Sequence, residues 1–436
     1  MSMQTEKSKI SEQQKQPVFT RIRLIGGLLL LLGAFIFLTG NTIDPETTST
    51  LLLEAGEIEE VPHITIPTLF FVMLTAVLAV AGGSAAMVVT DSASPMLKNT
   101  RNVLITLAGL IFVPAVLSAA VAGSSTNITV LIAESIRLAT PLAIGAMAGI
   151  WCERAGVINI AIEGMMLWAA CFGFTTMFTL NSMFPDNIAV IQVIAVLVAI
   201  FSAGIFSLLH AWLSITFRTD QIISGTVLNI MALGATSFIR REYLLGNSGG
   251  LARLPEIPIP VLSDIPILGD ALFSGQPIFY MMFVIIILTH VMLFYTRWGL
   301  RIRAVGENPH AADTLGIKVN RSRWINVFIS GMIAGLAGAW FSLEATGTFN
   351  DNMTAGAGFI ALAAVIFGKW YPFGAFGAAL LFGFSQAFGT SLQIIGVNFP
   401  VQFLQMLPFV VTIFVLAGFI GRANPPKASG QPYVKE

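Results

Sequence analysis

The chain has 436 residues, of which 55% are hydrophobic and 11% are charged, and its 23 basic residues balance its 23 acidic ones. A soluble domain carries about 25% charged residues, so this chain has too few charges to cover several water-facing surfaces. The neutral balance argues against nucleic acid as a partner, and two cysteines exclude a disulfide scaffold and a four-cysteine metal site.

Stretches without Asp, Glu, Lys or Arg mark the expected membrane spans, since a spanning helix needs about 20 mostly apolar residues. Continuously apolar runs such as 28–32 and 284–288 favour helices, because the strands of a membrane barrel alternate. We therefore predict an all-α, polytopic helical membrane protein of ten to twelve spans with broken helices, the last stretch being long enough for two crossings. The stretches are 24–43, 61–90, 102–133, 138–152, 164–185, 187–217, 221–239, 271–296, 324–343, 352–368 and 370–421.

Lysine and arginine predict the orientation of the chain. Basic residues precede the first span, whereas the loop 41–65 carries acidic residues and no basic one. The positive-inside rule then places both termini and the basic segment 296–323 in the cytoplasm, with loop 241–275 outside the cytoplasmic (plasma) membrane. We expect residues 1–20 and 422–436 to be solvated cytoplasmic tails, and an uncleaved anchor is favoured over a cleaved signal peptide.

Three small patterns predict packing within the spans. Glu134 and Arg137 are three residues apart on one helix and can neutralise each other near an interface. Glycines at 145/149 and at 331/335 have the GxxxG spacing, which permits close approach of helices within the chain or between chains.

The stretch 153–164, ERAGVINIAIEG, places polar side chains at membrane depth. Its first two residues mark a cytoplasmic edge, and Asn159 and Glu163 lie four residues apart on one helical face. At 1.5 Å per residue they are about 8 and 14 Å beyond that edge. Glycines bracket the stretch, which predicts a broken helix lining a cavity; a structural hydrogen-bond pair between helices is the equal alternative.

Four further polar residues are weaker candidates for a translocation path, and a structural role is the favoured alternative for each. They are Gln221, Ser224, Asn229 and Glu344.

The sequence lacks the common motifs of phosphate binding and of catalysis. It contains no GxxxxGK[ST] phosphate loop, no HExxH and no GxSxG, and its four histidines are far apart in sequence. We predict that the protein is not an enzyme and holds no metal or cofactor. Energy for uphill transport must then come from an ion gradient or from another subunit.

Residues 306–317, GENPHAADTLGI, carry the start and stop signals of a short helix. Asn308 can cap it, Pro309 suits its first position, and Gly316 suits the left-handed position after its end. About two turns are too few to cross a membrane, so the helix is either a docking element or a solvated connector. Its apolar patch is expected to consist of Ala311, Ala312 and Leu315.

The segment RWGLRIRAVGENPHAADTLGI (297–317) strongly resembles the cytoplasmic loop of bacterial ABC importer permeases. The branch is that of nucleoside and simple-sugar permeases, related to the ribose and branched-chain amino acid permeases. The resemblance continues in ATPLAIGAMAGIWCERAGVINIAIEGMMLWAA (139–170), TDQIISGTVLNIMALG (219–234) and GFIALAAVIFGKWYPFGAFGAALLFG (358–383). It implies an ABC importer permease core at 126–421, preceded by spans at 21–125 that resemble no family.

In that family the loop inserts a coupling helix into a cleft of an ATPase subunit. The resemblance implies an ABC ATPase with two nucleotide-binding domains, which binds ATP and Mg, a second permease subunit and an external substrate-binding lipoprotein as partners. The coupling residues carried over are Gly306, Glu307, Asn308, Pro309, Ala312, Asp313 and Gly316.

The form ERAGVINIAIEGMM resembles nucleoside-type permeases, so the expected function is uptake of nucleosides across the cytoplasmic membrane, driven by ATP hydrolysis in the separate subunit. Simple sugars or branched-chain amino acids are alternative substrates. A rival hypothesis is an ion-coupled secondary transporter in which Glu163 and Glu344 relay protons. A membrane-embedded scaffold subunit is the third.

Overall fold

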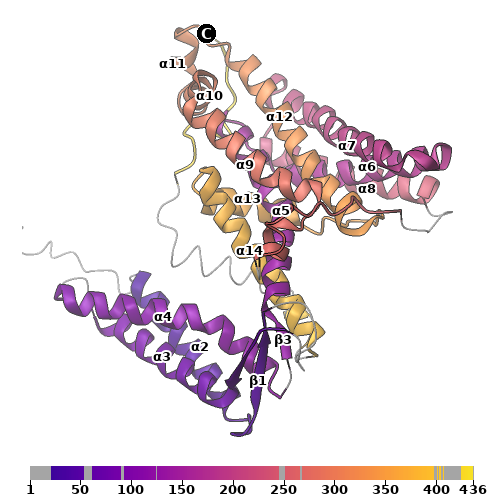
Figure 1. The fold of residues 1–436 in the computed structure, drawn as a ribbon. Coiled ribbons are helices and arrows are strands. Elements are labelled where there is room, and N and C mark those ends of the chain that lie inside the picture. Colours follow the sequence, from indigo (N-terminus) through magenta and orange to yellow (C-terminus); the bar gives the residue numbers. More distant parts are fainter. Residues whose placement is uncertain are drawn as a thin grey trace, which may run out of the picture. The chain divides into compact units, whose positions relative to one another are not determined.

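The computed structural model describes residues 21–53, 61–89, 93–123, 125–244, 251–265, 268–396, 400, 402–403, 406 and 424–435 (Figure 1). The chain divides into two compact units. The first contains residues 1–128, 394–398 and 413–421, and the second contains residues 129–393, 399–412 and 422–436.

Three long helices form most of the first unit: α2 (Arg21–Gly40), α3 (Thr68–Val88) and α4 (Pro95–Ala120). α2 and α3 pack through glycines, because a Cβ atom on Gly26 would lie 2.8 Å from the carbonyl oxygen of Gly83. Ser94 caps α4, and its side chain accepts a hydrogen bond from the amide of Leu97 at 3.5 Å.

A small sheet in the first unit corrects the all-α prediction. β1 (Thr48–Leu52) pairs antiparallel with β2 (His63–Pro67) and parallel with β3 (Ser125–Asn127). β-Branched threonines and isoleucines in β1 and β2 favour strands. β1 lies in the predicted loop 41–65, whereas β2 and β3 fall in the stretches 61–90 and 102–133 that were predicted to be spans. Buried Ser49 in β1 ties the sheet to α4, since its hydroxyl donates to the carbonyl of Ser118 at 2.7 Å.

The second unit is a bundle of helices, several of them short or ending in a π-turn. In chain order they are α5 (Ile128–Arg154), α6 (Ile162–Met183), η1 (Pro185–Asn187), α7 (Ile188–Ala211), η2 (Trp212–Thr216), α8 (Gln221–Ile239), η3 (Arg240–Leu244), η4 (Gly269–Phe273), α9 (Pro277–Tyr295), α10 (Arg297–Glu307), α11 (Pro309–Thr314), α12 (Val319–Ala339), η5 (Trp340–Thr346), α13 (Ala357–Phe367) and α14 (Pro372–Ile394).

Both GxxxG pairs mediate packing within the second unit. A Cβ on Gly331 would lie 2.8 Å from the carbonyl of Ala203, which brings α12 against α7. A Cβ on Gly145 would lie 2.9 Å from Ala361, which brings α5 against α13. Close packing inside one chain therefore accounts for this spacing in both places.

Within the residues that the structure describes, nine helices are long and apolar enough to cross a membrane. α6, which carries Glu163, and the 11-residue α13 are not among them. The second crossing predicted in 370–421 falls mostly on residues outside the described part. The protein is thus a mostly helical, multi-pass membrane protein.

The described part of loop 241–275 is ordered by backbone contacts. Ile257 and Ile259 donate hydrogen bonds to the carbonyls of Gly275 and Phe273, at 2.9 and 2.8 Å. The Tyr280 hydroxyl on α9 donates to the carbonyl of Ile257 at 2.9 Å. These hydrogen bonds tie residues 257–259 to residues 273–275 and to α9.

Candidate functional site

A break at residues 155–161 separates α5 from α6 and forms no helix. Within it the amide of Ile158 donates to Gln221 Oε1 at 2.7 Å, and its carbonyl oxygen lies 2.8 Å from His210 Nε2. Ser224 Oγ lies 3.4 Å from the other ring nitrogen of His210. Side chains of α7 and α8 therefore form hydrogen bonds with backbone groups of the break that have no partner within a helix. Such groups need a partner because leaving them unpaired away from water is unfavourable.

Two asparagines complete the support of the break. On α8, Asn229 Nδ2 donates to the carbonyl of Ile160 at 3.0 Å, while its Oδ1 accepts from the amide of Gly164 at 2.8 Å. Within the break, buried Asn159 donates to Ser330 Oγ on α12 at 3.0 Å. The break is thus held from α8 on one side and from α12 on another.

The carboxylate of Glu163 caps the start of α13. One oxygen, Oε1, accepts from the Thr354 hydroxyl at 2.6 Å and from the Gly356 amide at 2.8 Å, and Oε2 accepts from the Gly358 amide at 2.7 Å. Negative charge at a helix N-terminus is favourable because the first amides have no helical partner. A Cβ on Gly358 would lie 2.5 Å from the backbone of Glu163, so the two helix starts meet closely.

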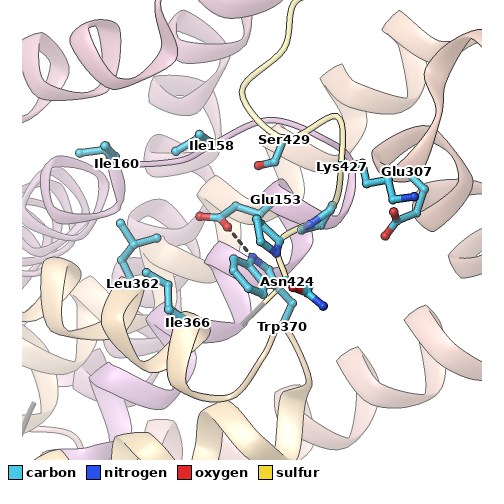
Figure 2. A pocket seen from close by; sticks show the side chains of 12 residues that line it. Glu153, Ile158, Ile160, Glu307, Leu362, Ile366, Trp370, Asn424, Lys427 and Ser429 are labelled. Atoms are coloured by element: carbon cyan, nitrogen blue, oxygen red, sulfur yellow. Dashed lines mark hydrogen bonds between the residues drawn. The ribbon is translucent and has the colours of Figure 1, made fainter. Parts of the chain in front are cut away.

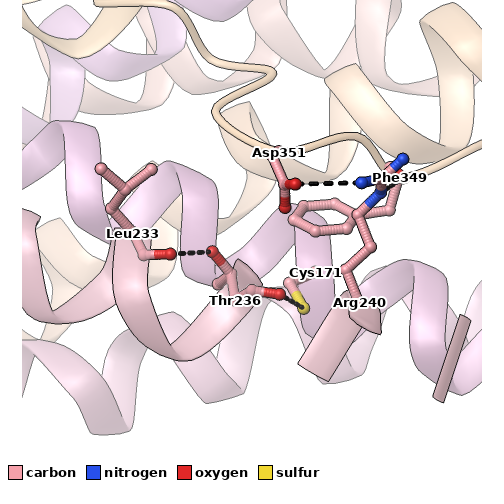
Figure 3. A network of polar contacts seen from close by, with 6 residues as sticks. All are labelled: Cys171, Leu233, Thr236, Arg240, Phe349 and Asp351. Atoms are coloured by element: carbon pink, nitrogen blue, oxygen red, sulfur yellow. Dashed lines mark hydrogen bonds and ion pairs between the residues drawn. The ribbon is translucent and has the colours of Figure 1, made fainter. Parts of the chain in front are cut away.

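The segment 347–356 that leads into α13 is also fixed at the end of α8. Figure 3 shows Arg240 reaching Asp351, with Nη1 to Oδ2 at 2.9 Å, and the Arg240 Nε donates to the carbonyl of Phe349 at 3.3 Å. α13 therefore starts from a segment that is anchored at both of its ends.

Glu344 lies apart from the break and performs a similar role. Its carboxylate oxygens accept from the amides of Ile278 and Phe279, at 2.7 and 3.1 Å, and so cap α9. Glu344 also borders a small, charged cavity of about 220 Å³. The other charged or polar side chains at this cavity are Glu134, Arg137, Arg253, Glu256 and Gln276. The predicted pair of Glu134 and Arg137 is present at 3.5 Å.

A larger cavity of about 880 Å³ lies where the break, α13 and the C-terminal residues meet (Figure 2). Its apolar wall comes from the break and from one side of α13, and its polar groups come from the ends of α5 and α10, from the residue Trp370 after α13 and from residues 424–429. The lining residues are Glu153, Ile158, Ile160, Glu307, Leu362, Ile366, Trp370, Asn424, Pro425, Pro426, Lys427 and Ser429.

The far end of α13 is tied to the end of α5 beside this cavity. Trp370 donates its indole hydrogen to buried Glu153, as Figure 2 shows, and its carbonyl accepts from Arg154 Nη2 at 2.9 Å. α13 is consequently held by glutamates at both ends, Glu163 at its start and Glu153 just after its end. Its cavity-facing residues are therefore positioned by the same two helices that flank the break.

The α10–α11 segment matches the predicted short helix closely. Asn308 caps α11, its Oδ1 accepting from the Ala311 amide at 3.0 Å, and Pro309 is the first helical residue. Gly316 follows the helix at φ +81°, in the left-handed region. Leu315 is 81% exposed. A large apolar side chain is therefore exposed at the end of this short helix.

Two predicted coupling residues do not share that surface. Gly306 is buried, and a Cβ there would collide with the carbonyl oxygen of Arg154, so this glycine lets α10 approach the end of α5. Ala312 is 2% exposed and packs inward, which removes it from the predicted apolar patch.

The C-terminal residues differ from the predicted solvated tail. Residues 424–435 pack against the second unit, with Ala428 and Tyr433 3% and 5% exposed. The amide of Ala428 donates to the carbonyl of Gly306 at 2.9 Å, and Arg323 Nη1 donates to the carbonyl of Gln431 at 2.9 Å. The segment is packed because it finds hydrogen-bond partners in distant parts of the chain, and no local sequence pattern predicts such partners.

The structure brings five of the six predicted path residues together around the break and leaves Glu344 at α9. Their polar atoms contact backbone groups and neighbouring side chains, whereas Ile158 and Ile160 face the cavity. Local patterns missed Thr354 and Ser330, which are ordinary hydroxyl residues in sequence. Among the described residues, no three His, Cys, Asp or Glu side chains lie close enough to hold a metal ion. The five gathered residues are Asn159, Glu163, Gln221, Ser224 and Asn229.

Comparison with known proteins identifies relatives of the second unit. Residues 131–416 match the family described as branched-chain amino acid transport system / permease component. The guanosine ABC transporter permease protein NupQ of Bacillus subtilis is 41% identical over 322 residues, which cover 71% of this chain and 97% of that protein. The nucleoside ABC transporter permease protein NupC of Lactococcus lactis is 40% identical over 71% of this chain and 98% of that protein.

A more distant relative occurs in the same Bacillus species. The guanosine ABC transporter permease protein NupP is 26% identical over 302 residues, which cover 65% of this chain and 80% of that protein. No solved structure matches this chain.

Proposed function

This chain belongs to the family of branched-chain amino acid transport system permease components, and from this membership we propose that it is the nucleoside-conducting permease subunit of an ABC importer. The observation that carries the proposal is 40–41% identity to guanosine and nucleoside permeases over nearly their whole lengths. The chain is a transport permease rather than an enzyme.

The break and α13 supply the inner part of the translocation path in this proposal. Ile158, Ile160, Leu362 and Ile366 offer apolar surface for a nucleobase, and the polar groups around the cavity suit a ribose. The gathered polar residues act by holding this wall in place. A cavity of about 880 Å³ is within the usual size of small-molecule sites.

The α10–α11 segment is the proposed coupling element, and it lies in the cytoplasm together with both termini. Exposed Leu315, with Glu307, Asn308 and Gly316 around it, would enter a cleft of an ATPase subunit that has two nucleotide-binding domains and binds ATP and Mg. Gly306 and Ala312 support the element from inside. Closure of the ATPase pair would push this segment and rock the permeases about the path.

A second permease subunit completes the transporter in this proposal. Closed two-fold or pseudo-two-fold symmetry requires two permeases around one path. The similarity to both NupQ and NupP, two guanosine ABC transporter permease proteins of Bacillus subtilis, supports a partner that differs from this chain. An external lipoprotein would deliver the nucleoside.

The contacts of the two intramembrane glutamates argue against the ion-coupled alternative. Glu163 accepts three hydrogen bonds and Glu344 two, all from groups that fix helix starts. Protonating either carboxylate would remove the charge that stabilises a helix start, so a proton relay through these residues would weaken the helices that they cap.

The test is purification of the tagged chain with its native partners, followed by reconstitution in liposomes. We expect ATP-dependent uptake of radiolabelled guanosine and adenosine, but no uptake by this chain alone under a proton gradient. Labelled ribose and leucine serve as substrate controls. Proton-driven uptake by the isolated chain, or uptake of leucine in preference to nucleosides, would contradict the proposal.

A further inference from the structure

The C-terminal segment, residues 424–435, contacts the coupling element and the cavity wall at the same time. Five of the twelve residues that line the cavity belong to it, from Asn424 to Ser429. Further along, Tyr433 and Lys435 reach α11. Glu307, the last residue of α10, also borders the cavity.

Tyr433 seats α11 on the rest of the second unit. It is 5% exposed and forms a cluster with Val305 of α10, Ala312 of α11 and Val319 of α12. Its ring lies 5.2 Å from that of His310. Ala312 is the buried residue of α11, so the position of this short helix depends on the cluster that Tyr433 completes.

The middle of the C-terminal segment lies against the break. A Cβ on Gly430 would lie 2.8 Å from Ile158 Cδ1, and a Cβ on Gly156 would lie 3.3 Å from the carbonyl oxygen of Ala428. Ala428 is also bonded to Gly306, at the end of α10. The C-terminal segment therefore contacts both α10 and the break, so a displacement of α10 and α11 would be passed to the break through these contacts.

A buried arginine fixes the segment to α12. Arg323 is 1% exposed, and its Nη1 donates to the carbonyl of Gln431 at 2.9 Å. Its guanidinium also reaches the break, since a Cβ on Gly156 would lie 2.8 Å from Nη2. Charge-assisted hydrogen bonds of this kind are the stronger ones in proteins, so the segment is held firmly at this point.

We propose that residues 424–435 transmit the movement of the coupling helix α11 to the break, and so to the wall of the translocation path. This inference rests on the proposed function, because it takes α11 as the element that the ATPase moves. Close packing supports it, since packed atoms pass on a displacement that a solvated tail would absorb.

The experiment uses the complex purified through a tag on the full-length chain. One variant ends after Ala423, and a second carries Tyr433→Ala, which empties the cluster at α11 without removing the segment. Tyr433→Phe keeps the ring, and Val434→Ala changes the exposed neighbour as a matched control. For truncation and Tyr433→Ala we expect assembly and ATP hydrolysis to persist while uptake per ATP falls about tenfold. Tyr433→Phe and Val434→Ala should behave like the unmodified chain.

A labelling experiment reads the movement without substrate. A cysteine replaces Ile160 in the cavity wall, and its rate of reaction with a thiol reagent is compared with and without ATP and vanadate. The two native cysteines, Cys152 and Cys171, are buried and give little background. We expect nucleotide to change the labelling rate in the full-length complex and to leave it unchanged in the truncated one.

The outcomes separate the two proposals. If nucleotide changes the labelling rate of the full-length complex but the complex imports no nucleoside, the proposed substrate is wrong. The proposed transmission is then tested by comparing the labelling of the full-length and truncated complexes. A response that survives both truncation and Tyr433→Ala refutes the transmission. Loss of ATPase association in Tyr433→Ala, with the permease still folded, refutes it too, because the segment would then be part of the docking surface.

Discussion

Replacing Glu163 by glutamine tests whether this carboxylate is a helix cap or a proton carrier. The carboxylate accepts from three donors, two at Oε1 and one at Oε2. The glutamine side chain has one acceptor oxygen, which can still accept from Thr354 and Gly356. Its NH2 group then faces the amide of Gly358, so the Gly358 amide is left without its acceptor.

The magnitude follows from the bond that is lost. A hydrogen bond to a charged group contributes about 1.5–3 kcal/mol, and the charge at the helix start adds about 0.3–1 kcal/mol. Glu163→Gln should therefore destabilise the second unit by about 2–4 kcal/mol, and Thr354→Val, which keeps the charge and two amide donors, by about 1 kcal/mol. Uptake should fall in parallel with stability, since α13 carries part of the cavity wall.

Thermal unfolding of the purified complex in detergent, followed by tryptophan fluorescence, measures these differences. Glu242→Gln on the exposed part of η3 is the matched control and should not change the midpoint. The reasoning is refuted if Glu163→Gln unfolds at the temperature of the unmodified complex. A proton relay predicts that very result, together with complete loss of uptake.

Three further predictions concern the coupling helix, the start of α13 and the break. Leu315→Asp should abolish copurification of the ATPase without changing permease stability, whereas Leu300→Asp, on another exposed leucine (61% against 81% for Leu315), should not; equal effects would contradict the proposed docking surface. Gly358→Ala should destabilise by about 1–3 kcal/mol because its Cβ meets the Glu163 backbone, while Gly377→Ala, with open space around it, should stabilise by about 0.5–1 kcal/mol; unfolding midpoints check both. Asn229→Ala leaves the Ile160 carbonyl of the break and the Gly164 amide of α6 unpaired and should cost about 2–4 kcal/mol, and an unchanged midpoint would show that water replaces the side chain.

Features with local causes were predictable from the sequence. The cap at Asn308, the proline after it and the left-handed Gly316 all act within one turn of α11, and the structure has each of them. The break was also predictable, because glycines and polar residues at membrane depth interrupt a helix for local reasons. The family resemblance was carried by these same stretches.

Features that depend on distant partners were not predictable. Glu163 bonds to residues about 190 positions later in the chain, and Thr354 belongs to a segment without a helical period. The packing of residues 424–435 rests on Arg323 and on carbonyl groups, which leave no mark in a single sequence. The strand at 48–52 needs a partner strand on each side before it is more than a polar loop.

The two glutamates at helix starts connect the fold to the source of energy. Protonating Glu163 would remove the negative charge that stabilises the start of α13 and would weaken the three hydrogen bonds that the carboxylate accepts there. Glu344 has the same constraint at α9. A wall held by carboxylate caps is suited to being moved as a whole, because such a motion need not break the bonds inside it. In our proposal the force comes from outside the wall and passes from α11 through the C-terminal segment, which contacts both α11 and the wall.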